Sequence, residues 1–137
     1  MDRKVSERFP HSYRIVRSVE YRAMYDNGEK IHSENFVLFY RPNEIGHPRL
    51  GITVSRKIGC ATVRNRAKRL FREIFRRSLN DIPENLDIVI NAKSGCAGRG
   101  YQDLCNEFIG AATKAGRLEF SKGSRTHANP LSAKNQP

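Results

Sequence analysis

The feature that most limits what this chain can fold into is residues 62–79, whose apolar side chains recur with the period of an α-helix. One continuous stripe is made by Val63, Ala67, Leu70, Phe71, Ile74 and Phe75. The spacing predicts an amphipathic helix from Thr62 to about Leu79. Such a stripe has to be buried, so the helix needs a sheet or another helix to cover it.

Strands are predicted on both sides of this helix. Residues 36–40 (FVLFY) and 50–55 (LGITVS) are rich in β-branched and aromatic side chains, and the turn-forming residues between them predict a hairpin. Residues 86–92 (LDIVINA) predict a central strand. The period of two assigns Phe36, Leu38 and Tyr40 to the core and leaves a mixed second face, suited to a short helix or to a ligand.

Two further helices complete the expected fold, one from Ser18 to about Asn27 and one from about Tyr101 to Ala115. The element order is α-β-β-α-β-α. It indicates an α+β fold, a two-layer sandwich of a small mixed sheet with helices on one side. A chain of 137 residues fits a single domain. We expect that domain over residues 14–118, with mobile tails at 1–13 and 119–137.

Most of the positive charge of the chain lies in one short stretch. Residues 56–77 contain nine basic side chains and one acid, which accounts for +8 of the net charge of +11. A solvated helix face usually mixes both signs so that opposite charges pair four residues apart. Unmixed like charges repel each other, so this face predicts a polyanionic partner.

No apolar run could span a membrane and no secretion signal is visible, so we expect a cytoplasmic protein.

Three aromatic residues form a second candidate site. Tyr21 and Tyr25 are four residues apart on one face of the first helix, and Phe39 lies on the mixed face of a strand. Aromatic rings beside a basic surface can stack unpaired bases. They can equally serve to bury the short helix against the sheet. The spacing alone favours neither interpretation.

A protein active site is not visible in the sequence. There are no paired carboxylates, no nucleophile-base set and no complete phosphate loop, and Asp81, Glu84 and Asp87 are expected to be ordinary solvated acids. The three cysteines lack metal-ligand spacing, which predicts reduced thiols. We therefore expect neither a metal site nor a cofactor bound by the protein alone.

The segment RLGITVSRKIGCATVRNRAKRLFREIFR, residues 49–76, closely resembles the signature of the bacterial ribonuclease P protein subunit. The likeness extends from about Arg14 to Ala115 and includes the Tyr21–Tyr25 pair and the strand FVLFY. The resemblance implies a sandwich shared with certain ribosomal proteins and an unusual left-handed β-α-β crossover. Two departures are that Cys60 stands where the family usually has Asn, and that Tyr replaces the commoner Phe at positions 21 and 25.

The resemblance also implies a function. In that family the RNA subunit carries out metal-dependent hydrolysis that removes the 5′ leader of precursor tRNA, so Mg²⁺ is expected only through the RNA. The protein binds the RNA subunit and the leader, and needs no protein partner. Carried over by position, the leader would contact Tyr21, Tyr25 and Phe39. The RNA subunit would contact Arg56, Lys57, Arg64, Asn65, Arg66, Lys68, Arg69, Arg72 and Arg76.

Two other classes of function compete with this one. The first is a stand-alone RNA-holding module, such as a ribosomal protein or an assembly factor with the same sandwich. Co-purification with ribosomal particles, without any effect on leader cleavage, would favour it. The second is a nuclease with its own metal site, which the missing carboxylate set disfavours.

Overall fold

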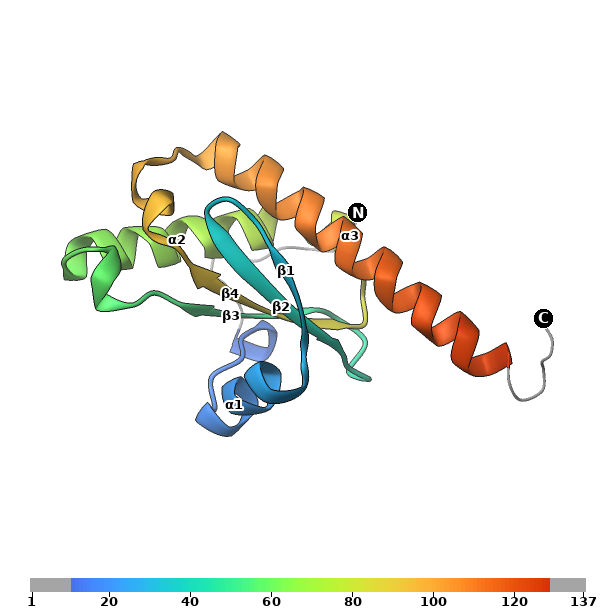
Figure 1. Ribbon diagram of the computed structural model, residues 1–137. Helices are drawn as coiled ribbons and strands as arrows, with labels where there is room; N and C mark the ends of the chain where they lie inside the picture. The colour runs from blue at the N-terminus through green and yellow to red at the C-terminus, as the bar shows by residue number, and fades with distance from the viewer. Residues whose placement is uncertain (1–10, 129–137) are drawn as a thin grey trace.

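The computed structural model describes residues 11–128 and shows the predicted α+β fold, with three helices and a mixed sheet that has four strands (Figure 1). The elements run in the order α1 (Ser18–Asn27), β1 (Glu29–His32), β2 (Phe36–Pro42), β3 (Arg49–Thr53), α2 (Ala61–Arg77), β4 (Leu86–Ala92) and α3 (Tyr101–Ala128). Within the described part of the chain, no helix is both long and apolar enough to cross a membrane.

The strand order β1-β2-β4-β3 shows that the predicted hairpin of β2 and β3 is wrong. β4 lies between them, antiparallel to β2 and parallel to β3. The reason is burial, since Leu86, Ile88, Val89 and Ile90 are fully enclosed and a strand that is apolar on both faces belongs at the centre of a sheet. The true hairpin partner of β2 is β1, which the prediction missed because Ile31 is its single buried residue.

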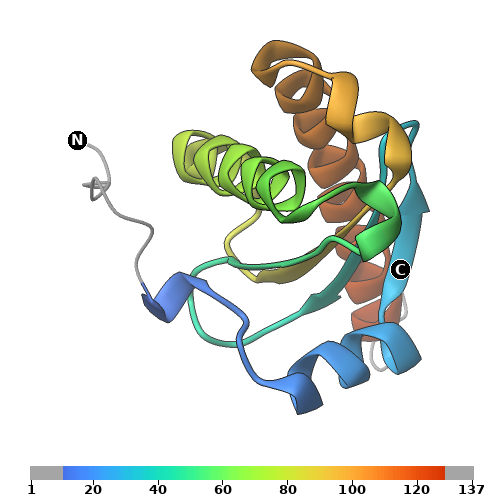
Figure 2. The same ribbon diagram turned by 90° about the vertical axis from the view of Figure 1, so that its left-hand side faces the viewer.

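The two faces of the sheet are covered unequally. α2 and α3 pack on one face and enclose the main core, in which Phe36, Leu38, Phe71, Ile74 and Phe108 are almost wholly buried. α1 lies on the opposite side of the sheet from α2 (Figure 2), over a small cluster of Ile15, Met24 and Val89. The expectation of helices on one side therefore holds for α2 and α3 and is wrong for α1.

α3 is longer than predicted. Its backbone stays helical to Ala128, beyond the expected end near Ala115, because no proline interrupts the chain between Tyr101 and Pro130. The segment 119–128, expected as the start of a tail, is thus helical backbone. The remaining parts of the expected tails, 1–10 and 129–137, lie outside the described residues. The left-handed sense of the β3-α2-β4 connection stays an expectation from the resemblance.

Candidate nucleic-acid interface

α2 turns its apolar stripe to the sheet and its basic side chains outward. Ala67, Phe71, Ile74 and Phe75 are buried, as the periodicity predicted. On the other side, Asn65, Arg66 and Arg69 are exposed, while Lys68, Arg72 and Arg76 are half-buried. The helix therefore presents one basic surface, which includes most of the residues predicted to bind RNA.

Four cations of this surface have no acidic partner. Arg66, Lys68, Arg69 and Arg72 form no ion pair or hydrogen bond with the described residues. The one acid of the helix, Glu73, instead pairs with Arg76 and Arg77, each at 2.5 Å. The hydrogen bond from Arg76 is the main reason that the pKa of Glu73 lies below its ordinary value. The mutual repulsion of the four unpaired cations can be offset by phosphate groups.

The turn before α2 extends the basic surface. Arg56 and Lys57 are exposed on a 3₁₀ turn, η2 (Arg56–Ile58), that contacts α2. Arg64 of α2 donates a hydrogen bond back to the carbonyl oxygen of Gly59, at 2.9 Å. Cys60 is exposed at the start of the helix, and the backbone N–H groups of Val63 and Thr62 lower the pKa of its thiol. All the predicted RNA-subunit residues thus lie on η2 and α2.

Tyr25 and Phe39 meet on the outer face of the sheet, which is the face that carries α1. Their ring centroids are 4.8 Å apart in an edge-to-face arrangement, and the Tyr25 hydroxyl lies 2.8 Å from Oγ1 of Thr53. The Nζ atom of Lys30 lies 5.9 Å from the Phe39 centroid. Tyr25 is 38% exposed, so the pair offers an aromatic surface beside a cation.

Tyr21 has a more structural position than Tyr25. Its ring packs so tightly on β3 that a Cβ at Gly51 would lie 2.8 Å from its hydroxyl oxygen, and that oxygen accepts a hydrogen bond from the backbone N–H of Ile52 at 3.3 Å. Burial raises its pKa above the ordinary value. Burial of the short helix against the sheet therefore accounts for the position of Tyr21. The exposed ring of Tyr25 instead fits the alternative interpretation, stacking of an unpaired base.

The basic and the aromatic residues meet at the open edge of β3. A cavity of about 250 Å³ there is lined by Tyr21 from α1, by Lys68 and Arg72 from α2, and by Arg14, which the sequence prediction did not include. The backbone of Arg14 forms an isolated parallel β-bridge with Leu50, and the backbone N–H of Ile15 donates to the Leu50 carbonyl oxygen. Lys68 and Arg72 of the basic surface therefore lie beside Tyr21, one of the three predicted aromatic residues.

A polar cluster, which we name the Arg49 clamp, fastens α1 to the sheet. Arg49 donates to Glu20 of α1 at 3.1 Å and to both carboxylate oxygens of Asp87 at 2.7 and 3.0 Å, and Asn43 also donates to Asp87. Its hydrogen bonds to Asp87 hold the pKa of Arg49 above the ordinary value. The expectation that Asp87 is a solvated acid is wrong, because it is 7% exposed on the central strand.

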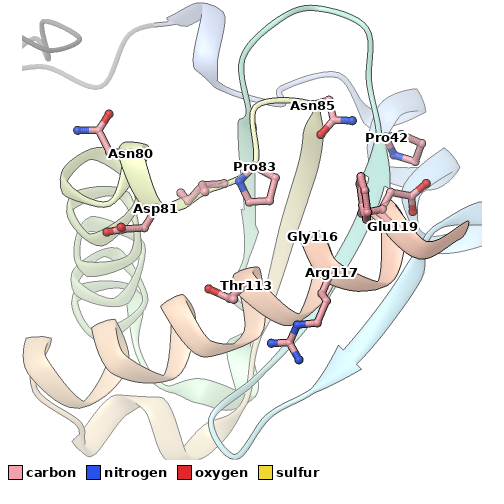
Figure 3. A pocket seen from close by; sticks show the side chains of 11 residues that line it. Pro42, Asn80, Asp81, Pro83, Asn85, Thr113, Gly116, Arg117 and Glu119 are labelled. Carbon is pink, nitrogen blue, oxygen red and sulfur yellow. The ribbon is translucent and has the colours of Figure 1, made fainter. Parts of the chain in front are cut away.

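The rest of the described chain offers few groups for chemistry. No group of three or more His, Cys, Asp or Glu side chains between residues 11 and 128 is arranged to hold a metal ion. The three cysteines are free thiols, as predicted. A cavity of about 830 Å³ lies between α3 and the segment before β4 (Figure 3), where Pro83 packs on Gly116. None of the predicted site residues lines it.

Comparison with known proteins agrees with the resemblance in the sequence. A family model described as Ribonuclease P matches residues 9–116. A ribonuclease P protein component of Syntrophus aciditrophicus is 39% identical over 103 residues, which cover 75% of this chain and 87% of that protein. One from Desulfovibrio desulfuricans is 40% identical, covering 73% and 80%. The solved RNase P protein from Thermotoga maritima superposes with a TM-score of 0.70 at 30% identity, covering 74% of this chain and 96% of that one.

Proposed function

The chain belongs to the ribonuclease P protein family, which processes the 5′ leader of tRNA, and on this premise we propose that it binds the RNA subunit and the leader through two adjoining surfaces. The basic surface of η2 and α2 binds the RNA subunit. The aromatic surface of Tyr25 on α1 and Phe39 on β2 binds the single-stranded leader of precursor tRNA. We also propose that the protein acts in the cytoplasm and requires no protein partner.

One observation carries the proposal: Lys68 and Arg72 of α2 line one cavity at the edge of β3 together with Tyr21, which lies one turn of α1 from Tyr25. Phosphates of a folded RNA can lie along Arg66 and Arg69, which face solvent. A single strand that leaves this RNA meets Lys68 and Arg72 first and the aromatic pair next. Cations that hold the backbone beside rings that stack bases are the usual means of binding unpaired nucleic acid.

Within this scheme the protein takes part in an RNA-cleaving enzyme. We propose that the hydrolysis itself is carried out by the RNA subunit and that Mg²⁺ is held by the RNA. What supports this is the chemistry of the surface, since guanidinium and ammonium groups attract phosphates and are not ligands for a hard cation. The contribution of the protein is then binding energy and positioning.

The test is reconstitution of the protein with ribonuclease P RNA and precursor tRNA at near-physiological magnesium. We expect faster leader removal than with RNA alone. Arg69→Ala should weaken binding to the RNA subunit and reduce the salt dependence of log Kd by about one unit, as one lost phosphate contact would. Tyr25→Ala should chiefly weaken binding of precursor tRNA. Equal loss of both affinities in both variants would contradict the two-surface scheme, and cleavage activity in the complete absence of RNA would contradict the division of labour.

A further inference from the structure

Asn91 is half-buried on the sheet face that carries the aromatic pair. Side chains alternate along a strand, and Val89 of β4 packs with Met24 under α1, so Asn91 points to the same face. Its register partners are Val37 on β2 and Thr53 on β3. Side chains of register partners lie about 5 Å apart, and diagonal ones about 7–8 Å apart. Asn91 is therefore diagonal to Phe39, whose own register partner is Val89.

The contact between Tyr25 and Thr53 brings the aromatic pair to this row of side chains. The Tyr25 hydroxyl lies 2.8 Å from Oγ1 of Thr53, which sits directly beside Asn91 in the parallel pairing. A base stacked against Tyr25 or Phe39 would thus have its edge toward the Asn91 amide. The stacking surface and the amide come from three different elements, α1, β2 and β4, that only the folded sheet brings together.

The amide of Asn91 has no partner within the described residues, although the side chain is half-buried. Asn35 and Asn43 flank the same sheet and differ in this respect. Asn35 donates to Glu107 at 2.8 Å, and Asn43 donates to Asp87 at 2.7 Å. Asparagine is disfavoured within strands, and the neighbours of Asn91 in β4 are apolar. The side-chain amide of Asn91 therefore keeps its N–H donors and its carbonyl acceptor available to a ligand.

We propose that Asn91 determines base specificity in the leader, an inference that rests on the leader-binding role proposed above. Stacking on Tyr25 and Phe39 accepts any base, because every base has a π-face. The Asn91 amide adds one donor and one acceptor at the edge of that base, which is how side-chain amides distinguish bases. The ligand is one unpaired nucleotide whose edge presents a donor next to an acceptor in the matching order.

The experiment uses the reconstituted holoenzyme and precursor tRNAs whose leaders differ by single-nucleotide changes. With the wild-type protein, kcat/KM should depend on the base at one leader position by about tenfold, the discrimination of one well-placed amide contact. Asn91→Val should remove this dependence and leave the affinity for the RNA subunit unchanged. Asn91→Leu, closer in size to asparagine and also without an amide, repeats the test if the valine variant folds poorly. Asn106→Leu changes an exposed asparagine on α3 and should keep the wild-type pattern.

Each other outcome has a definite meaning. If the wild-type protein shows no base dependence, or if the dependence survives in the Asn91 variants, then Asn91 does not determine specificity. A uniform loss for all leaders would make Asn91 a contact to sugar or phosphate and would also overturn the proposal. A protein that gives no gain over RNA alone would instead refute the leader-binding function, so the two failures are distinguishable.

Discussion

The two faces of the sheet are built in different ways. Under α2 and α3 the face is sealed by large apolar side chains such as Phe71 and Phe75, which are 1% and 0% exposed. Under α1 the apolar cluster has three buried members, and the Arg49 clamp supplies much of the attachment. The difference suggests a division of roles, in which one face holds the fold together and the other is left partly open for a ligand.

The largest expected effect tests this division directly. Phe71→Ala removes a ring from the sealed core and should reduce the free energy of unfolding by about 3–5 kcal/mol, because a cavity remains where the ring was. Both RNA-subunit and leader affinity should fall with the folded fraction. Met24→Ala, in the small cluster under α1, should cost less and should spare RNA-subunit binding. The measurements are urea unfolding and binding assays with the RNA subunit and with precursor tRNA. Equal losses of stability and of both affinities in the two variants would contradict the proposed difference between the two faces.

Arg49→Met tests the polar attachment of α1. Removing one member of a partly buried ion cluster leaves Asp87 without its main partner and should cost about 1–3 kcal/mol. Because Glu20 is released at the same time, α1 should loosen and precursor tRNA should bind less tightly, while RNA-subunit affinity stays unchanged. Hydrogen exchange should show faster exchange in α1 and not in α2. Arg22→Met, an exposed change on α1, should alter none of these quantities.

The sequence predicted some of these features and could not predict others. α2 and its basic surface were predictable because residues three and four apart share a helix face whatever the helix packs on. The strand order was not predictable, since the pairing of β2 with β4 joins segments that are distant in the chain. The Arg49 clamp and the position of Asn91 depend on that order. Arg49, Asp87 and Asn91 acquire their neighbours only when β4 lies between β2 and β3.

Glu107 gives the sealed face a polar attachment of its own, which titrates with acid. Burial alone would raise the pKa of this α3 carboxylate, but hydrogen bonds from Ser33 and Asn35 outweigh it and lower the pKa. Its contribution to stability is therefore full above about pH 4.3, the ordinary value for Glu, and is lost as the pH falls through the lower folded value. Glu107→Gln should cost about 1 kcal/mol at pH 7 and abolish this part of the acid dependence in urea unfolding. An unchanged acid dependence would show that Glu107 does not couple α3 to the β1–β2 turn.

The smallest expected effect concerns the charge of the basic surface itself. Glu73→Gln releases Arg76 and Arg77 from their shared carboxylate, so RNA-subunit affinity should rise a few-fold at low salt, with a salt slope steeper by up to about one unit. Because Arg76 lowers the pKa of Glu73, mild acid would leave the carboxylate charged, and the substitution is needed to remove it. Glu44→Gln makes the same charge change in the exposed turn between β2 and β3 and should leave the affinity unchanged. A loss of affinity in Glu73→Gln would mean that Glu73 holds the two arginines in place for the RNA, so that the surface depends on geometry as well as on net charge.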